Sequence, residues 1–108
     1  MIIKRCVGPE EVEVTFRLPS EVSFERVNVV GDFNGWSQTA TPMRSDGEGL
    51  VATVVCDAGR RYRYRYLADG HRWANDWQAD DYVPNQFGGE DSVLDLTAMP
   101  ARPPVGTD

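Results

Sequence analysis

The sequence predicts an all-β fold in a single domain, because apolar and polar residues alternate, turn signals are closely spaced and helical periodicity is lacking. The chain has 108 residues, of which 41% are hydrophobic and 26% charged, a composition typical of a globular domain with one core. Turn-forming residues recur about every 8 to 12 positions, the spacing of small β-sandwiches. We therefore expect about seven short strands in two packed sheets.

The first strands follow from period-2 alternation. Residues 11–18 form a half-buried strand with one wet face, whose apolar positions are Val12, Val14, Phe16 and Leu18. A second β-rich run covers residues 26–32, with Val27 and Val29 on one face. Residues 33–36, Phe-Asn-Gly-Trp, then form a turn.

The later strands are separated by short segments rich in glycine and aspartate, which favour turns. These strands are expected at residues 41–45, 50–56, 60–68, 71–73 and 92–96. Residues 75–90, which contain Pro84, Gly88 and Gly89, are expected to form a loop. Together the elements indicate an immunoglobulin-like β-sandwich.

The domain organisation follows from the same pattern. We expect an N-terminal arm at residues 1–10, the sandwich at residues 11–97 and a Pro-rich disordered tail at residues 98–108. Cys6 and Cys56 are the two cysteines of the chain, and they can pair only if the arm lies beside the strand that carries Cys56. A reducing compartment favours free thiols, with Cys56 in the core.

The charge of the chain restricts its partners. Seventeen acidic and eleven basic side chains give a formal net charge of −6, which disfavours nucleic acid and anionic membrane surfaces. A neutral partner meets no such repulsion. The apolar run Met1 to Ile3 is too short for a signal peptide, and no run reaches the length of a membrane span. A cytoplasmic protein is the expectation.

Catalytic and metal-binding groups are sparse. His71, the one histidine of the chain, follows a tight turn, where an exposed side chain is expected. Asp76, Asp80 and Asp81 lack the spacing of a calcium-binding loop, so we expect solvated loop acids and turn caps. The sequence therefore predicts no enzyme activity, no metal and no cofactor.

The run of residues 60–66, Arg-Arg-Tyr-Arg-Tyr-Arg-Tyr, mixes basic and aromatic side chains, as single-stranded nucleic-acid platforms do. Such a platform needs both kinds on one side, whereas strand geometry sends alternate residues to opposite faces. We expect the tyrosines in or beside the core and the arginines outside, where one of them can hydrogen-bond a neutral ligand.

The tryptophans indicate a binding surface. Trp36, Trp73 and Trp77 all fall in predicted loops or at strand ends. An exposed indole offers a large flat face with a polar edge. Two or more of them outside the core favour a shared surface for a ligand.

Four segments, taken together and in this order, resemble family 48 of the carbohydrate-binding modules over about residues 12–96. That family includes the glycogen-binding domain of the AMP-activated kinase β subunit and the N-terminal early-set domain of isoamylases and branching enzymes. The segments are residues 29–36 (VVGDFNGW), 64–70 (YRYLADG), 73–76 (WAND) and 87–94 (FGGEDSVL).

The resemblance implies a sugar-binding site. Trp36 and Trp73 match the tryptophans that stack on glucose rings in glycogen-binding members, with one residue inserted between Gly70 and Trp73. Arg65 matches a basic residue that donates to sugar hydroxyls.

The loop before the last strand completes the implied site with Phe87, Gly89 and Asp91. Phe87 matches an apolar residue of the family. The family has a small polar residue where this chain has Gly89, and an asparagine where it has Asp91. Gly89 then offers backbone groups alone, and Asp91 accepts hydrogen bonds without the amide donor.

Two functions are expected from these features. The first is non-catalytic binding of glycogen, maltooligosaccharides or related α-1,4-glucans. The alternative is a protein-interaction domain of the early-set fold that docks on a separately encoded glucan-processing enzyme or a regulatory partner and binds no sugar itself.

Overall fold

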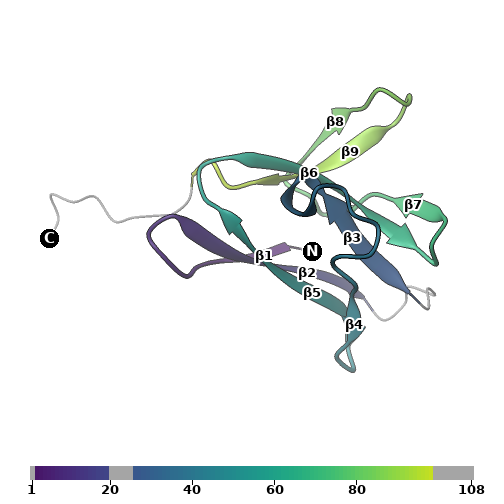
Figure 1. Ribbon diagram of the computed structural model, residues 1–108, viewed down its shortest axis with the longest axis horizontal. Helices are drawn as coiled ribbons and strands as arrows, with labels where there is room; N and C mark the ends of the chain where they lie inside the picture. The colour runs from purple at the N-terminus through teal and green to yellow at the C-terminus, as the bar shows by residue number, and fades with distance from the viewer. Residues whose placement is uncertain (1, 20–25, 99–108) are drawn as a thin grey trace, which may run out of the picture.

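The computed structural model describes residues 2–19 and 26–98, and there the chain forms two antiparallel β-sheets packed as a sandwich (Figure 1). The four-stranded sheet has the order β1-β2-β5-β4 and consists of β1 (Ile2–Cys6), β2 (Glu11–Pro19), β5 (Gly49–Asp57) and β4 (Arg44–Ser45). The second sheet has the path β3-β6-β9-β8, formed by β3 (Val27–Gly31), β6 (Arg61–Ala68), β9 (Glu90–Asp95) and β8 (Asp81–Pro84). The all-β sandwich that the sequence predicts is confirmed.

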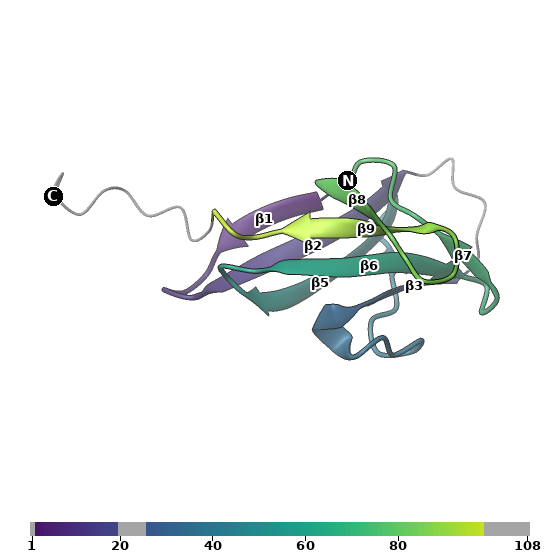
Figure 2. The same cartoon turned by 90° about the horizontal axis from the view of Figure 1, so that it is seen from above.

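Strand β6 is the central strand of the second sheet. Strand β3 pairs with one of its edges. The other edge is shared, because β9 pairs with residues 61–64 and the short strand β7 (Arg72–Ala74) with residues 66–68. Figure 2 shows β6 and β9 side by side, with β7 at one end.

Two strands differ from the sequence-based expectation. Residues 2–6 of the expected arm form β1, which pairs with β2 from Ile2 to Cys6. The expected loop at residues 75–90 contains β8, which ends at Pro84. Pro84 favoured the interpretation of these residues as a loop, because proline has no N–H to donate to a sheet. An edge strand tolerates a proline, and β8 lies at the edge of its sheet.

The core lies between the sheets and contains the inward residues of β2, β3 and β6. Phe16 is packed against Tyr64 with ring centroids 4.9 Å apart and against Phe33 at 5.5 Å. The tyrosines of β6 point inward and its arginines outward, as expected. The largest buried apolar side chains are Phe16, Tyr64, Leu94, Leu96, Val12, Val14, Val27, Val29, Val30 and Val93.

The expectation that Asp76 is a solvated loop acid is wrong. Asp76 is 1% exposed, and its Oδ2 accepts hydrogen bonds from the hydroxyls of Tyr64 (2.8 Å) and Tyr66 (3.0 Å). Burial raises the pKa of Tyr64 and of Tyr66, and the Asp76 carboxylate adds to this rise, so both phenols remain protonated donors. Asp76 thus fastens the loop after β7 to the core.

Three of the polar side chains that the sequence analysis singled out lie at the surface. His71 is exposed, and Asp80 and Asp81 form ion pairs with Lys4 (2.8 Å) and Arg61 (2.6 Å). Within residues 2–19 and 26–98, no group of three or more His, Cys, Asp or Glu side chains could hold a metal ion. No helix in the same ranges has the length and apolar character of a membrane span.

The two thiols are free, Cys6 exposed and Cys56 buried. Val12 of β2 pairs with both positions, so one strand separates them. Two strand spacings amount to about 9–10 Å, beyond the reach of a disulfide. Burial raises the pKa of Cys56 to about 11. The expected disordered tail lies, except for Ala98, outside the described residues.

We predict that Asp76→Ala lowers the free energy of unfolding by about 3 kcal/mol, because it leaves the hydroxyls of Tyr64 and Tyr66 buried without their acceptor. Urea denaturation followed by tryptophan fluorescence measures the change. Glu48→Ala is the control, because that side chain is 85% exposed and its removal should change stability by less than about 0.5 kcal/mol. Equal stability of the two variants would contradict the assigned role of Asp76.

Candidate binding groove

The turn after β3 presents Trp36 to solvent. A short 3-10 turn, Asp32–Asn34, is followed by Gly35 at φ 68°, and Trp36 itself has φ 60°. The side chain of Asn34 stabilises this turn, since Oδ1 accepts the N–H of Gly31 (3.1 Å) and Nδ2 donates to the carbonyl of Val29 (2.8 Å). The Trp36 N–H donates to the Gly31 carbonyl at 2.9 Å, which holds the left-handed conformation.

The Trp36 ring is oriented by Asp32. Its Nε1–H donates to Oδ1 of Asp32 at 2.8 Å, while Oδ2 of the same carboxylate accepts the backbone N–H of Arg63 at 2.8 Å. Trp36 is 37% exposed. Because the indole N–H already has an acceptor, the ring offers a contact surface through its face.

Trp73 and Arg65 form the second part of the site. Trp73 lies opposite Leu67 in the β6–β7 pair and is 41% exposed. The Arg65 guanidinium carbon lies 5.9 Å from the centre of the Trp73 ring, within the range of a cation–π contact. Arg65 Nε is buried and has no hydrogen-bond partner among the described residues.

The loop between β8 and β9 is built around Asn85. Its Oδ1 accepts the N–H groups of Phe87 (2.9 Å) and Gly89 (3.1 Å), and its own N–H donates to the Gly89 carbonyl at 2.9 Å. This compact loop pushes Phe87 outward to 84% exposure. The backbone N–H and C=O of Gly89 are thus both hydrogen-bonded to Asn85. The contact of Gly89 with a sugar, which the resemblance implies, stays a prediction.

Asp91 lies beneath this loop and is 6% exposed. Its Oδ1 accepts a hydrogen bond from Asn85 Nδ2 at 3.1 Å, and its Oδ2 lies 3.8 Å from Arg63 Nη1. A carboxylate this buried requires such partners, because an unpaired buried charge is strongly destabilising.

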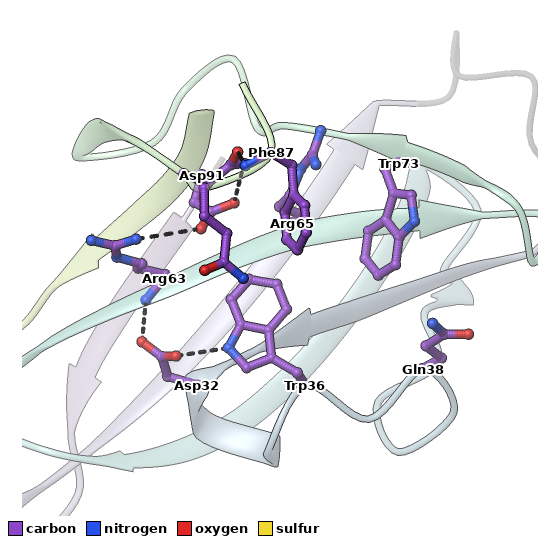
Figure 3. Close-up of a pocket in the computed structure, with 10 residues that line it drawn as sticks. Asp32, Trp36, Gln38, Arg63, Arg65, Trp73, Phe87 and Asp91 are labelled. Atoms are coloured by element: carbon purple, nitrogen blue, oxygen red, sulfur yellow. Dashed lines mark hydrogen bonds and ion pairs between the residues drawn. The ribbon is translucent and has the colours of Figure 1, made fainter. Parts of the chain in front are cut away.

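These segments enclose one open groove of about 880 Å³ (Figure 3). The structure brings together five of the six residues that the resemblance selected, while Gly89 of the β8–β9 loop lies outside the lining. Trp77, which the resemblance did not select, lies outside the lining as well. The groove is lined by Asp32, Trp36, Gln38, Arg63, Arg65, Trp73, Asn85, Gln86, Phe87 and Asp91.

Sequence reasoning missed five residues of the groove lining, namely Asp32, Gln38, Arg63, Asn85 and Gln86. Asp32 stands in the VVGDFNGW segment, and an asparagine directly after Pro84 is a turn signal, so both positions carried some indication. The carboxylates Asp32 and Asp91 balance the guanidinium groups of Arg63 and Arg65. The ionised side chains of the lining thus sum to no formal charge, which suits an uncharged polar ligand.

A β-sandwich that carries an aromatic groove on the outer face of one sheet is typical of small binding modules. Residues 6–83 match the family described as carbohydrate-binding module 48, the isoamylase N-terminal domain, and the chain belongs to this family. Carbohydrate-binding modules bind sugars without transforming them, so carbohydrate binding is the general function that family membership supports.

Curated relatives with detectable similarity include branching enzymes. The chain is 45% identical over 49 residues to the 1,4-alpha-glucan branching enzyme GlgB 2 of Xanthomonas campestris pv. campestris, a match that covers 43% of this chain and 7% of the enzyme. It is 42% identical over 45 residues to the 1,4-alpha-glucan branching enzyme GlgB of Nocardia farcinica, covering 41% of this chain and 6% of that enzyme. The matches thus span less than a tenth of the length of these relatives.

We predict that two glycines of the Trp36 turn differ in their tolerance of alanine. A Cβ at Gly31 would meet the Arg63 carbonyl at 2.5 Å and the Tyr64 Cβ at 2.7 Å, so Gly31→Ala should cost about 2–3 kcal/mol of stability through overpacking. A Cβ at Gly35 meets nothing within 4 Å, so Gly35→Ala should cost only the left-handed strain of about 1 kcal/mol. Chemical denaturation of both variants measures the difference, and equal costs would argue against this turn geometry.

Proposed function

We propose that this domain binds glycogen or related α-1,4-glucans in the groove, with Trp36 and Trp73 stacking on glucose rings and Arg65 donating to hydroxyls. The observation that carries the proposal is the presence of two partly exposed indoles and the Arg65 side chain in one groove. Figure 3 shows Trp36, Phe87 and Trp73 arranged around the opening of this groove. Phe87, Gly89 and Asp91 close one side of the proposed site.

The chemistry of a glucose ring matches this lining. Each pyranose has a patch of C–H groups on its faces and hydroxyls around its rim. A flat indole covers the C–H patch, while fixed donors and acceptors bind the rim. Because the sugar is neutral, its binding requires no counter-charge in a groove whose own charges balance.

The expected affinity is modest. Burying about 100 Å² of apolar surface per stacked ring contributes about 2.5 kcal/mol, and hydrogen bonds from a charged arginine add about 1.5–3 kcal/mol. Association and ordering costs remove much of this total, which leaves a dissociation constant of about micromolar to millimolar. Such affinity is useful on a polymer that repeats the same epitope many times.

We predict that Trp36→Ala and Trp73→Ala each weaken binding of glycogen or maltoheptaose at least about tenfold, because each removes one stacking surface. Trp77→Ala is the matched control, since Trp77 is 67% exposed and lies outside the groove lining. Affinity electrophoresis in a glycogen-containing gel measures the retardation of each variant. Retardation of both groove variants equal to that of the unmodified protein would overturn the proposal.

A second candidate function, docking on a protein, is favoured by Trp77. The Asp76 side chain next to it points into the core, while Trp77 is 67% exposed in the loop after β7. A large exposed indole outside a ligand groove is a frequent element of protein interfaces. On this interpretation the domain contacts a glucan-processing enzyme through Trp77, and the changes at Gly89 and Asp91 reflect a groove that no longer binds sugar.

We predict from this second candidate that maltoheptaose gives no heat at millimolar concentration in calorimetry, while a purified 1,4-alpha-glucan branching enzyme binds the domain. Trp77→Ser should then reduce enzyme binding at least about tenfold, because exposed tryptophans often dominate interface energies, and Trp36→Ala should leave it unchanged. Binding of maltoheptaose that depends on Trp36 and Trp73 would contradict this second candidate and support glucan binding.

A further inference from the structure

Arg63 is connected to the Trp36 side of the groove by its backbone and to the Phe87 side by its side chain. Its backbone N–H donates to Oδ2 of Asp32, and Oδ1 of the same carboxylate accepts the indole N–H of Trp36, both at 2.8 Å. Asp32 therefore links the orientation of the Trp36 ring to the backbone of β6.

The guanidinium of Arg63 extends toward the side of the groove that carries Phe87. Nη1 lies 3.8 Å from Oδ2 of Asp91, whose Oδ1 accepts from Asn85 at 3.1 Å. Asn85 in turn accepts the N–H of Phe87 at 2.9 Å. Figure 3 shows this series of contacts running from Trp36 to Asp91 through Asp32 and Arg63. We call Asp32, Arg63, Asp91 and Asn85 the cross-groove network.

We propose that the Arg63 side chain is a positioning residue, which acts through Asp91 and Asn85 to hold the Phe87 loop at the separation from the Trp36 turn that the ligand requires. The Trp36 turn itself is held through Asp32 by the Arg63 backbone, which substitution of the side chain leaves in place. This inference rests on the proposed function and deepens it, because it assigns Asp91 to the support of the groove wall. The network acts before the ligand arrives and lowers the ordering cost of binding.

The burial of Asp91 supports this role. The side chain is 9% exposed, and its two oxygens face an amide donor and a guanidinium, so the carboxylate is engaged within the protein. A negative charge at this depth needs the nearby cation of Arg63. An asparagine at position 91 would still accept from Asn85, though less strongly than a carboxylate, and it would offer Arg63 no charge. Positions 63 and 91 should therefore be energetically coupled.

The substitution Asp91→Asn distinguishes between two roles of Asp91 in ligand binding. If position 91 acts by donating an amide to the sugar, Asp91→Asn restores a donor and strengthens binding. If it acts in the cross-groove network, Asp91→Asn loosens the Phe87 loop and weakens binding. The two roles predict changes of opposite sign for one substitution.

The experiment is a double-mutant cycle with Arg63→Gln, Asp91→Asn and the double variant, using calorimetry with maltoheptaose and a thermal midpoint for each protein. We expect each single variant to weaken binding about three- to tenfold, and the double variant to be no weaker than either single one, which is the mark of contacting residues. Arg63→Lys, which keeps the charge, should recover part of the affinity. Additive effects, or tighter binding by Asp91→Asn, would overturn the proposal.

A second measurement reports on the loop without any sugar. In Arg63→Gln, amide hydrogen exchange at Phe87 and Gly89 should accelerate at least about threefold, because the anchor of Asn85 is weakened. Arg61→Gln is the matched control, since Arg61 lies on the same face of β6 and pairs with Asp81, outside the groove lining. Unchanged exchange at both amides in Arg63→Gln would also overturn the proposal.

Trp36→Ala and the network variants together distinguish a failure of glucan binding from a failure of the positioning role of Arg63. If Trp36→Ala binds maltoheptaose as well as the unmodified protein does, the glucan proposal fails, and the exchange measurement alone decides whether Arg63 positions the loop. If Trp36→Ala weakens binding while the network variants do not, the glucan proposal stands and Arg63 has no positioning role.

Discussion

The structure depends on the two-residue alternation of β6, because this strand contributes side chains both to the core and to the groove. Its tyrosines point inward, where Tyr64 and Tyr66 donate to the buried carboxylate of Asp76. Its arginines point outward, and Arg63 and Arg65 line the groove. A shift of register by one residue would exchange the two faces. The hydrogen bonds to Asp76 therefore fix the placement of the groove arginines as well as the packing of the core.

Local patterns account for most of the fold. The alternation in β2 and β6 is strong enough to predict both strands and the faces that they bury in the core. Strand β8 could not be predicted in this way, since it is a short edge strand that ends in Pro84. The burial of Asp76 escaped prediction for another reason. A loop carboxylate enters the core only when donors far along the chain meet it, and those contacts are set by tertiary packing.

The groove was less accessible to pattern reasoning than the fold. Alternation places Arg65 on an outer face, but nothing local to the sequence shows that Trp36 and Trp73 lie near it while Trp77 does not. The family resemblance supplied that grouping, and the structure places Trp36, Trp73 and Arg65 in one lining. The contacts through Arg63 could not be inferred from either source, because they join residues of β6, the Trp36 turn and β9 that lie far apart in the sequence.

The hydrogen bonds already made in the groove limit what a ligand can use. The indole N–H of Trp36 is satisfied by Asp32, and the Asp91 oxygens face Asn85 and Arg63. What a ligand can meet is mainly ring faces, together with the Arg65, Gln38 and Gln86 side chains of the lining. A ligand rich in hydroxyls but with an apolar ring face needs this combination, because stacking supplies area while a few donors set orientation. An anionic ligand would gain little, since the charges of Arg63 and Arg65 are balanced by the nearby carboxylates of the same lining.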